Sequence, residues 1–189
     1  PVTEMITGFD LVKAQLRIAL NMNISLNQND IKFSGHSMEC RINAEDPETF
    51  QPSPGKITKM HTPGGFGIRY DSHIYGGYTV PPYYDSLLAK IITQANSRDS
   101  SIKRMISALD EFFIEGIKTN HSLHQNILHD DTFLNNKHTI NYLENELPAK
   151  LEKLLIIVDK QANENKKLII WSNFIGTINL IENKIREKG

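Results

Sequence analysis

The chain has 189 residues, of which 39% are apolar and 23% are charged, a composition that supports a folded core and excludes a wholly disordered protein. Its formal net charge of −1 at pH 7 gives no general electrostatic attraction to nucleic acid or to an anionic membrane. The sequence contains no apolar run long enough to span a membrane and no secretory leader, so we expect a cytoplasmic protein. A single cysteine, Cys40, excludes an internal disulfide and a zinc site built from cysteines.

The first residues predict helices. Because the chain starts at Pro1 and not at methionine, we interpret it as a piece of a longer protein. A short helical turn is expected over 3–7, and a longer helix is expected over 10–20, where Asp10 can cap the first turn. Apolar residues recur at helical spacing along this second helix. They are Val12, Leu16 and Ala19.

Strands and tight turns are predicted from residue 31 to residue 94. Glycine- and proline-rich turns separate apolar segments of five to eight residues, which is the pattern of an antiparallel sheet built from hairpins. The turns lie at 52–55, 63–67, 76–77 and 81–82. Another strand is predicted over 87–93.

Helices return after Arg98. The first carries one apolar stripe, and Gly116 stands where a glycine would cap its C-terminal end. The stripe consists of Ile102, Met105, Ile106, Leu109, Phe112 and Phe113. Thr119 can cap the next helix, with Leu123 and Ile127 facing inward. A sheet followed by helices makes residues 31–147 an α+β unit.

The composition changes after Leu147. All eight prolines lie at or before Pro148, whereas residues 149–189 carry eight basic and five acidic side chains. Apolar spacing in this tail predicts a helix, a strand at the sequence KKLIIWSNF and a final helix. A strand without polar alternation is typical of a parallel sheet that is covered on both faces. One such strand is an incomplete unit, so we place a domain boundary at 148.

The segment SGHSMECRINAEDPETF, residues 34–50, carries the residues best suited to chemistry. On a strand, His36, Met38, Cys40 and Ile42 would share a core face, and Ser37, Glu39, Arg41 and Asn43 would share a polar face. On that polar face, Arg41 could bind a carboxylate-like or enolate-like group. The alternative is a surface ion pair with Glu39, worth less than about 1 kcal/mol.

Other candidate sites have simpler structural interpretations. His36 and Cys40 would lie about 13 Å apart along a strand, so we interpret them as core residues and predict no metal site. The sequence GGFG at 64–67 lacks the Gly-Lys-Ser/Thr of a phosphate-binding loop and is interpreted as a hairpin turn. The tyrosines are interpreted as packing residues and not as a stacking platform for bases.

Four stretches resemble biotin carboxylase, the ATP-dependent component of acetyl-CoA carboxylase and related enzymes. They are PVTEMITGFDLVKAQLRIA (1–19), GHSMECRINAEDPETFQPSPGKIT (35–58), HTPGGFGIRYDSHIYGGYTVPPYYDSLLAKII (61–92) and EGIKTN (115–120). The likeness extends to about residue 147. It implies that residues 1–27 end an ATP-grasp domain and that 28–148 form the family's antiparallel-sheet-rich C-terminal domain with flanking helices. Pyruvate and propionyl-CoA carboxylases share these stretches.

The resemblance implies roles for individual residues. Arg41 falls on the family arginine that contacts bicarbonate and the ureido oxygen of biotin, where a fixed guanidinium would stabilise developing negative charge. Glu39 and Asp85 are candidates for orienting this site. Three further positions correspond to an adenine pocket and a dimer contact. Ile140 falls on the adenine pocket, and Phe66 and Arg69 fall on the dimer contact.

The resemblance also implies a reaction and partners. The family carboxylates biotin on a carrier protein with ATP, Mg²⁺ and bicarbonate, the first half-reaction of acetyl-CoA carboxylase in fatty acid synthesis. The implied partners are the biotin carboxyl carrier protein, a second copy in a homodimer and a carboxyltransferase. The family's glycine-rich loop, phosphate-binding lysines, metal ligands and catalytic arginine have no counterpart here, so we expect the isolated chain to bind neither ATP nor metal and to be inactive.

The tail supports a different resemblance. Residues 149–189 resemble the start of the second helicase lobe of SNF2-type ATPases, through a helix, a strand ending in WSNF and a helix. Two alternative functions therefore stay open, a non-catalytic module for dimer or carrier contacts and a piece of a nucleic-acid-dependent ATPase. The overall charge does not favour nucleic acid as a partner.

Overall fold

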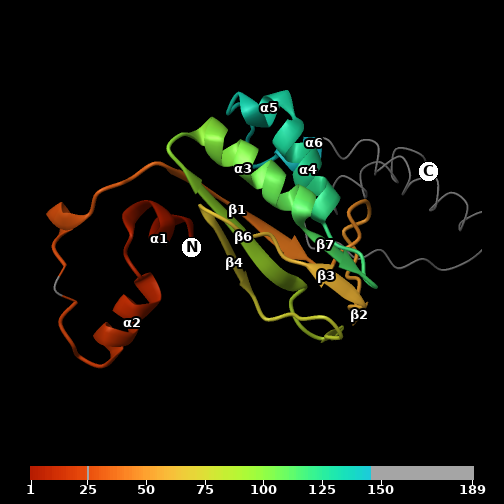
Figure 1. Ribbon diagram of the computed structural model, residues 1–189, viewed down its shortest axis with the longest axis horizontal. Helices are drawn as coiled ribbons and strands as arrows, with labels where there is room; N and C mark the ends of the chain where they lie inside the picture. Colours follow the sequence, from red (N-terminus) through yellow and green to blue (C-terminus); the bar gives the residue numbers. More distant parts are fainter. Residues whose placement is uncertain (25, 146–189) are drawn as a thin grey trace, which may run out of the picture. The chain divides into compact units, whose positions relative to one another are not determined.

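A computed structural model describes residues 1–24 and 26–145 (Figure 1). Pro1–Leu134 form one compact unit, and the residues from Asn135 onward belong to a second unit. The described part of the second unit contains helix α6, Tyr142–Asn145. The expected helix, strand and helix of 149–189 lie outside the described residues.

A three-stranded antiparallel sheet forms the centre of the first unit. Its strands are β1 (His36–Asn43), β6 (Leu87–Ala95) and β4 (Ile68–Ser72), in the order β1-β6-β4. Strand β6 is buried along most of its length because it has a neighbour on each side, whereas β1 is an edge strand. The predicted antiparallel sheet and its strand over 87–93 are therefore confirmed.

Helices cover one face of this sheet (Figure 1). Helix α3 (Arg98–Glu111) packs on β1 and β6, and helix α4 (His121–His129) packs on α3 and β1. The short helix α5, Asp131–Leu134, follows against α4. Helix α3 begins where Ser97 Oγ accepts a hydrogen bond from the Ser100 backbone amide, which satisfies one free donor of the first turn.

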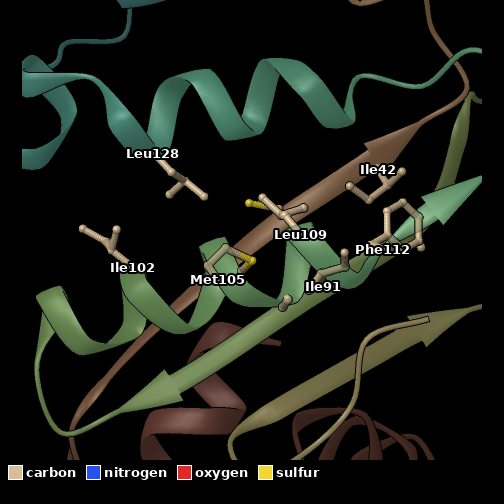
Figure 2. Close-up of a cluster of buried hydrophobic side chains, with 10 residues drawn as sticks. Ile42, Ile91, Ile102, Met105, Leu109, Phe112 and Leu128 are labelled. Atoms are coloured by element: carbon tan, nitrogen blue, oxygen red, sulfur yellow. The ribbon is translucent and has the colours of Figure 1, made fainter. Parts of the chain in front are cut away.

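The main core lies between the sheet and helices α3 and α4 (Figure 2). The predicted stripe of the third helix contributes side chains that are almost completely buried, together with Ile42 and Ile91 from the sheet. These helical residues are Ile102, Met105, Leu109 and Phe112. Phe113 departs from the prediction and is 46% exposed, because the helix has ended and the chain has become a strand.

Two short ribbons complete the first unit. Strand β2 (Gly55–Lys56) pairs with β5 (Thr79–Val80), and β3 (Lys59–His61) pairs with β7 (Phe113–Glu115), both antiparallel. A second apolar cluster lies beside them. It consists of Ala44, Ile57, Ile74, Val80 and Leu88.

Two predicted helix caps are wrong. Helix α3 ends at Glu111, and Gly116 lies beyond β7, where its φ is 99° and an added Cβ would collide with the Lys56 carbonyl oxygen. Glycine is needed here because two backbones approach closely, and not because a helix ends. The residue before helix α4 is Asn120, not Thr119, and its side chain is used elsewhere.

The N-terminal helices form as expected. They are α1 (Val2–Thr7) and α2 (Leu11–Ala19). A 3₁₀ turn that was not predicted, η1 (Gln28–Asp30), follows them. Asp10 caps α2, because its Oδ1 accepts a 2.8 Å hydrogen bond from the Lys13 amide. None of the helices among residues 1–24 and 26–145 is long and apolar enough to cross a membrane.

The apolar stripe of α2 has the predicted helical spacing but is not buried. Val12 and Leu16 are each 61% exposed, and Ala14 is the residue of this helix that packs inward. Spacing indicates which residues share a face, but it does not indicate what covers that face.

Candidate functional site

The two faces of β1 separate the core from the candidate site. Cys40 and Ile42 are buried in the main core and Met38 packs against it, whereas Arg41 is exposed. The predicted division of faces is confirmed for these residues. Ser37 differs, because it is buried and donates a 2.8 Å hydrogen bond to the Thr93 carbonyl oxygen.

The backbone of Arg41 is held by helix α4 and the residue before it. Asn120 Nδ2 donates a 3.0 Å hydrogen bond to the Arg41 carbonyl oxygen, and His124 Nε2 lies 2.8 Å from the same oxygen. Asn120 also binds Asn43, accepting from its amide at 2.9 Å and donating from its own amide at 3.2 Å. The Arg41 carbonyl and the backbone amide and carbonyl of Asn43 are therefore satisfied without another strand.

The loop that follows β1 is fixed by the same segment. Asp46 accepts hydrogen bonds from the amides of Glu48 and Thr49, and Lys118 Nζ lies 2.6 Å from its other oxygen. The Lys118 ammonium and these amides hold the pKa of Asp46 well below its usual range. The Lys118 amide also donates to Ser53 Oγ at 2.9 Å. Both ends of the loop are thus attached to residues 118–120.

The two acidic candidates do not meet Arg41. The Glu39 carboxylate lies 3.9 Å from the Pro1 nitrogen, and within residues 1–24 and 26–145 no ion pair joins it to Arg41. Asp85 Oδ1 accepts a 2.7 Å hydrogen bond from the Leu87 amide, which orders the turn that enters β6. Asp85 therefore stabilises a local turn.

The interpretation of His36 and Cys40 as core residues is confirmed for Cys40, which is buried, whereas His36 is only partly buried. Among the described residues, no group of three or more His, Cys, Asp or Glu side chains could hold a metal ion. Burial, together with the neighbouring charge of Glu39, raises the pKa of the Cys40 thiol to about 12. This thiol stays protonated at neutral pH and is unreactive.

The two residues of the expected dimer contact differ in their surroundings. Phe66 is 93% exposed in the turn before β4, with the Arg104 guanidinium 5.7 Å from its ring centroid. Arg69 is paired within the chain, because it contacts Glu4 of α1 and Asp71 of β4, each at 2.7 Å. Ile140 belongs to the second compact unit and is fully exposed there.

Sequence reasoning missed the partners of both arginines. Asn120 and His124 lie 79 and 83 residues from Arg41, and Glu4 lies 65 residues from Arg69. Spacing along the chain carries no signal for such contacts. Within the sequence EGIKTN, Gly116 and Thr119 predict helix caps, whereas no role is predicted for the last residue, Asn120, which binds the Arg41 backbone.

The sheet, its covering helices and the arginine on its edge strand define a known class of domain. Residues 39–145, more than half of the 189, match the biotin carboxylase C-terminal domain. The chain belongs to this family.

Individual biotin carboxylases are similar to the same part of the chain. Biotin carboxylase of Haemophilus influenzae is 61% identical over 147 residues, which are 78% of this chain and 33% of that protein. Biotin carboxylase of Pseudomonas aeruginosa is 53% identical over the same shares. The chain therefore spans about one third of the length of these relatives.

Solved structures give the same result. The biotin carboxylase domain dimer of Hydrogenobacter thermophilus 2-oxoglutarate carboxylase, in complex with MgADP, ADP and bicarbonate, has a TM-score of 0.76 and 50% identity. The similarity covers 79% of this chain and 33% of that one. Biotin carboxylase from Campylobacter jejuni has a TM-score of 0.72 and 44% identity, over 75% of this chain and 32% of that one. The family match ends at residue 145, so the helicase-like interpretation of 149–189 stays a prediction about residues outside the described part.

Proposed function

We propose that the chain is the C-terminal part of a biotin carboxylase, which carboxylates biotin on a carrier protein with ATP and bicarbonate. The observation that carries this proposal is the placement of Arg41. Its guanidinium is exposed on a sheet edge, while its backbone is fixed by β6 on one side and by Asn120 and His124 on the other. The high identity to biotin carboxylases supports the same assignment.

Arg41 has the chemistry that this reaction requires. Carboxylation of biotin forms an N–C bond at a ureido nitrogen, which must first lose its proton. Removal of that proton places negative charge on the ureido oxygen. A guanidinium offers two parallel N–H donors to such an oxygen or to bicarbonate, and a donor held in place beforehand stabilises charge as it develops.

The nucleotide phosphates and the metal are assigned to the remaining part of the enzyme. The described residues contain no cluster of side chains that could hold Mg²⁺. ATP-dependent activation of bicarbonate would therefore depend on the two thirds of the relatives that this chain does not span. We accordingly expect the 189-residue chain alone to show no bicarbonate-dependent ATP hydrolysis.

The proposal includes partners and a cellular role. The enzyme would act in the cytoplasm on a biotin carboxyl carrier protein, together with a carboxyltransferase, in the acetyl-CoA carboxylase step of fatty acid synthesis. It would work as a homodimer, with Phe66 contributing an exposed aromatic side chain to the contact. Ile140 is assigned to the adenine pocket, and Glu39 and Asp85 to the surroundings of the site.

The test replaces the matching segment of Haemophilus influenzae biotin carboxylase with residues 31–147 of this chain. The graft should carboxylate biotin, and Arg41→Ala should lower kcat by about a hundredfold to a thousandfold, as expected for the loss of one transition-state donor. Arg41→Lys should recover part of the rate, because it keeps the charge but loses the planar fork.

Lys59→Ala is the matched control, because it removes another exposed basic side chain, whose ammonium lies 3.7 Å from Glu115. It should leave kcat within about twofold, as expected for an exposed ion pair. An Arg41→Ala graft as active as this control would contradict the role of Arg41. An inactive native graft that is correctly folded would contradict the proposed function itself.

A further inference from the structure

The carbonyl group of Arg41 is an unusual point in the fold, because two side chains from another element meet there. An edge strand normally leaves its outer carbonyl groups to water. Here Asn120 Nδ2 and His124 Nε2 lie 3.0 Å and 2.8 Å from the same oxygen. A carbonyl oxygen only accepts, so the Nε2 of His124 carries the proton in this contact.

We propose that Asn120, assisted by His124, is a positioning residue that sets the location of the Arg41 guanidinium through the Arg41 backbone. This inference rests on the proposed function of Arg41. It adds a residue of the EGIKTN sequence to the active site, although that residue contacts no substrate.

The side chain of Asn120 is fully used in this arrangement. It is 7% exposed, its Nδ2 donates to the Arg41 carbonyl and its Oδ1 accepts from the Asn43 amide. The Asn120 amide also donates a backbone hydrogen bond to the Asn43 carbonyl oxygen. At Arg41 and Asn43, Asn120 therefore makes hydrogen bonds like those of a neighbouring antiparallel strand. Because the buried amide is bonded through both its nitrogen and its oxygen, it ties β1 to the residue before helix α4 at this point.

Asn120 is itself held on a rigid support. Gly116 allows the backbone to approach Lys56, and Lys118 is bonded to Asp46 and Ser53. Burial lowers the pKa of His124, which favours its neutral imidazole. The neighbouring His121 also lowers the pKa of His124. The Nε2 of His121 lies within hydrogen-bond distance of the Leu109 carbonyl oxygen.

Arg41 needs such support because its own side chain supplies little. Among the described residues, no hydrogen bond or ion pair fixes its guanidinium. The position of the guanidinium therefore depends on the position of the Arg41 backbone, which Asn120 and His124 hold. A displacement of about 1 Å from the productive geometry can slow an enzyme by about a hundredfold.

The test uses the active graft described above. Asn120→Ala should lower kcat by about tenfold to a hundredfold and leave KM for ATP unchanged. Asn120→Asp keeps the acceptor for the Asn43 amide but loses the donor to Arg41, so it should lower kcat to a similar extent. Ser37→Ala is the matched control, because it removes another buried side-chain hydrogen bond of β1, and it should keep kcat within about twofold.

A double-mutant cycle separates positioning from general loss of stability. If Asn120 acts through Arg41, then Asn120→Ala should change kcat by less than about twofold in an Arg41→Ala graft. Equal losses in both backgrounds would overturn the proposal, as would an Asn120→Asp graft that retains the native kcat. If Asn120→Ala does not fold, His124→Ala removes one of the two bonds and should give a severalfold loss that also disappears in the Arg41→Ala background.

The native graft distinguishes failure of this inference from failure of the proposed function. If the native graft is inactive, the proposed function is wrong. If it is active and sensitive to Arg41→Ala but insensitive to both Asn120 variants, the proposed function stands and the positioning role is wrong.

Discussion

Replacing Gly116 with alanine should destabilise the chain by about 2–4 kcal/mol. The φ angle of Gly116 is 99°, and an added Cβ would collide with the Lys56 carbonyl oxygen and lie 3.1 Å from the Thr58 amide nitrogen. Both contacts are with backbone, which cannot rotate away as a flexible side chain can.

The magnitude has two parts. Holding a non-glycine residue at this φ costs about 1–2 kcal/mol. Moving the Lys56 backbone to admit the methyl group costs about 1–2 kcal/mol more, since overpacking a filled site has a cost in this range. With a urea slope of about 2 kcal/mol/M, the unfolding midpoint should fall by about 1–2 M.

Urea denaturation followed by circular dichroism measures this shift. Gly76→Ala is the matched control, because an added Cβ there meets nothing within 4 Å, and its free energy of unfolding should stay within about 0.5 kcal/mol of the native value. Gly116→Asn tests the cause, because asparagine tolerates a left-handed helix cap but collides with Lys56 as alanine does. A Gly116→Asn variant as stable as the native chain would refute the close-approach explanation and leave the positive φ angle as the reason for glycine.

Two further predictions concern charge and assembly. Asp46→Asn should destabilise the chain by about 1 kcal/mol at pH 7, as measured by urea titration at several pH values. Because Lys118 and two amides lower the pKa of Asp46, its stabilisation is present above the ordinary carboxyl range and should disappear as the pH falls below about 4, so curves that stay parallel down to pH 2 would contradict this. In the active graft, Phe66→Ala should weaken the dimer by about tenfold or more in sedimentation experiments. Phe33→Ala, at another exposed phenylalanine, should leave the dimer intact, and equal effects would contradict a specific role for Phe66.

The sequence predicted the elements whose pattern is local. Alternation along residues 36–43 identified which side of β1 faces the core, and Cys40 and Ile42 are buried there. The helical stripe predicted from Ile102 to Phe113 was found in the same way and is confirmed as far as Phe112, because side chains three and four residues apart share one face of a helix. Such periodicity depends on backbone geometry alone, so it can be seen without knowing the fold.

Contacts between distant segments could not be predicted in this way. The bonds from Asn120 and His124 to Arg41, and from Glu4 to Arg69, depend on which helix packs on which strand. The role of Gly116 also depends on a contact with a distant segment. Its position after a helical stripe predicted a cap, but the residue that requires glycine is Lys56 in another strand.

The two arginines of the central sheet differ in how accessible their side chains are to a ligand. Arg69 contacts two carboxylates, Glu4 and Asp71, and these raise its pKa and occupy its donors. A ligand would have to break those contacts before binding Arg69. Arg41 shows the opposite arrangement. Four hydrogen bonds join the backbone of Arg41 and Asn43 to Asn120 and His124, and the Arg41 side chain is exposed. An arginine with a fixed backbone and accessible N–H donors is suited to stabilise negative charge that develops only in the transition state.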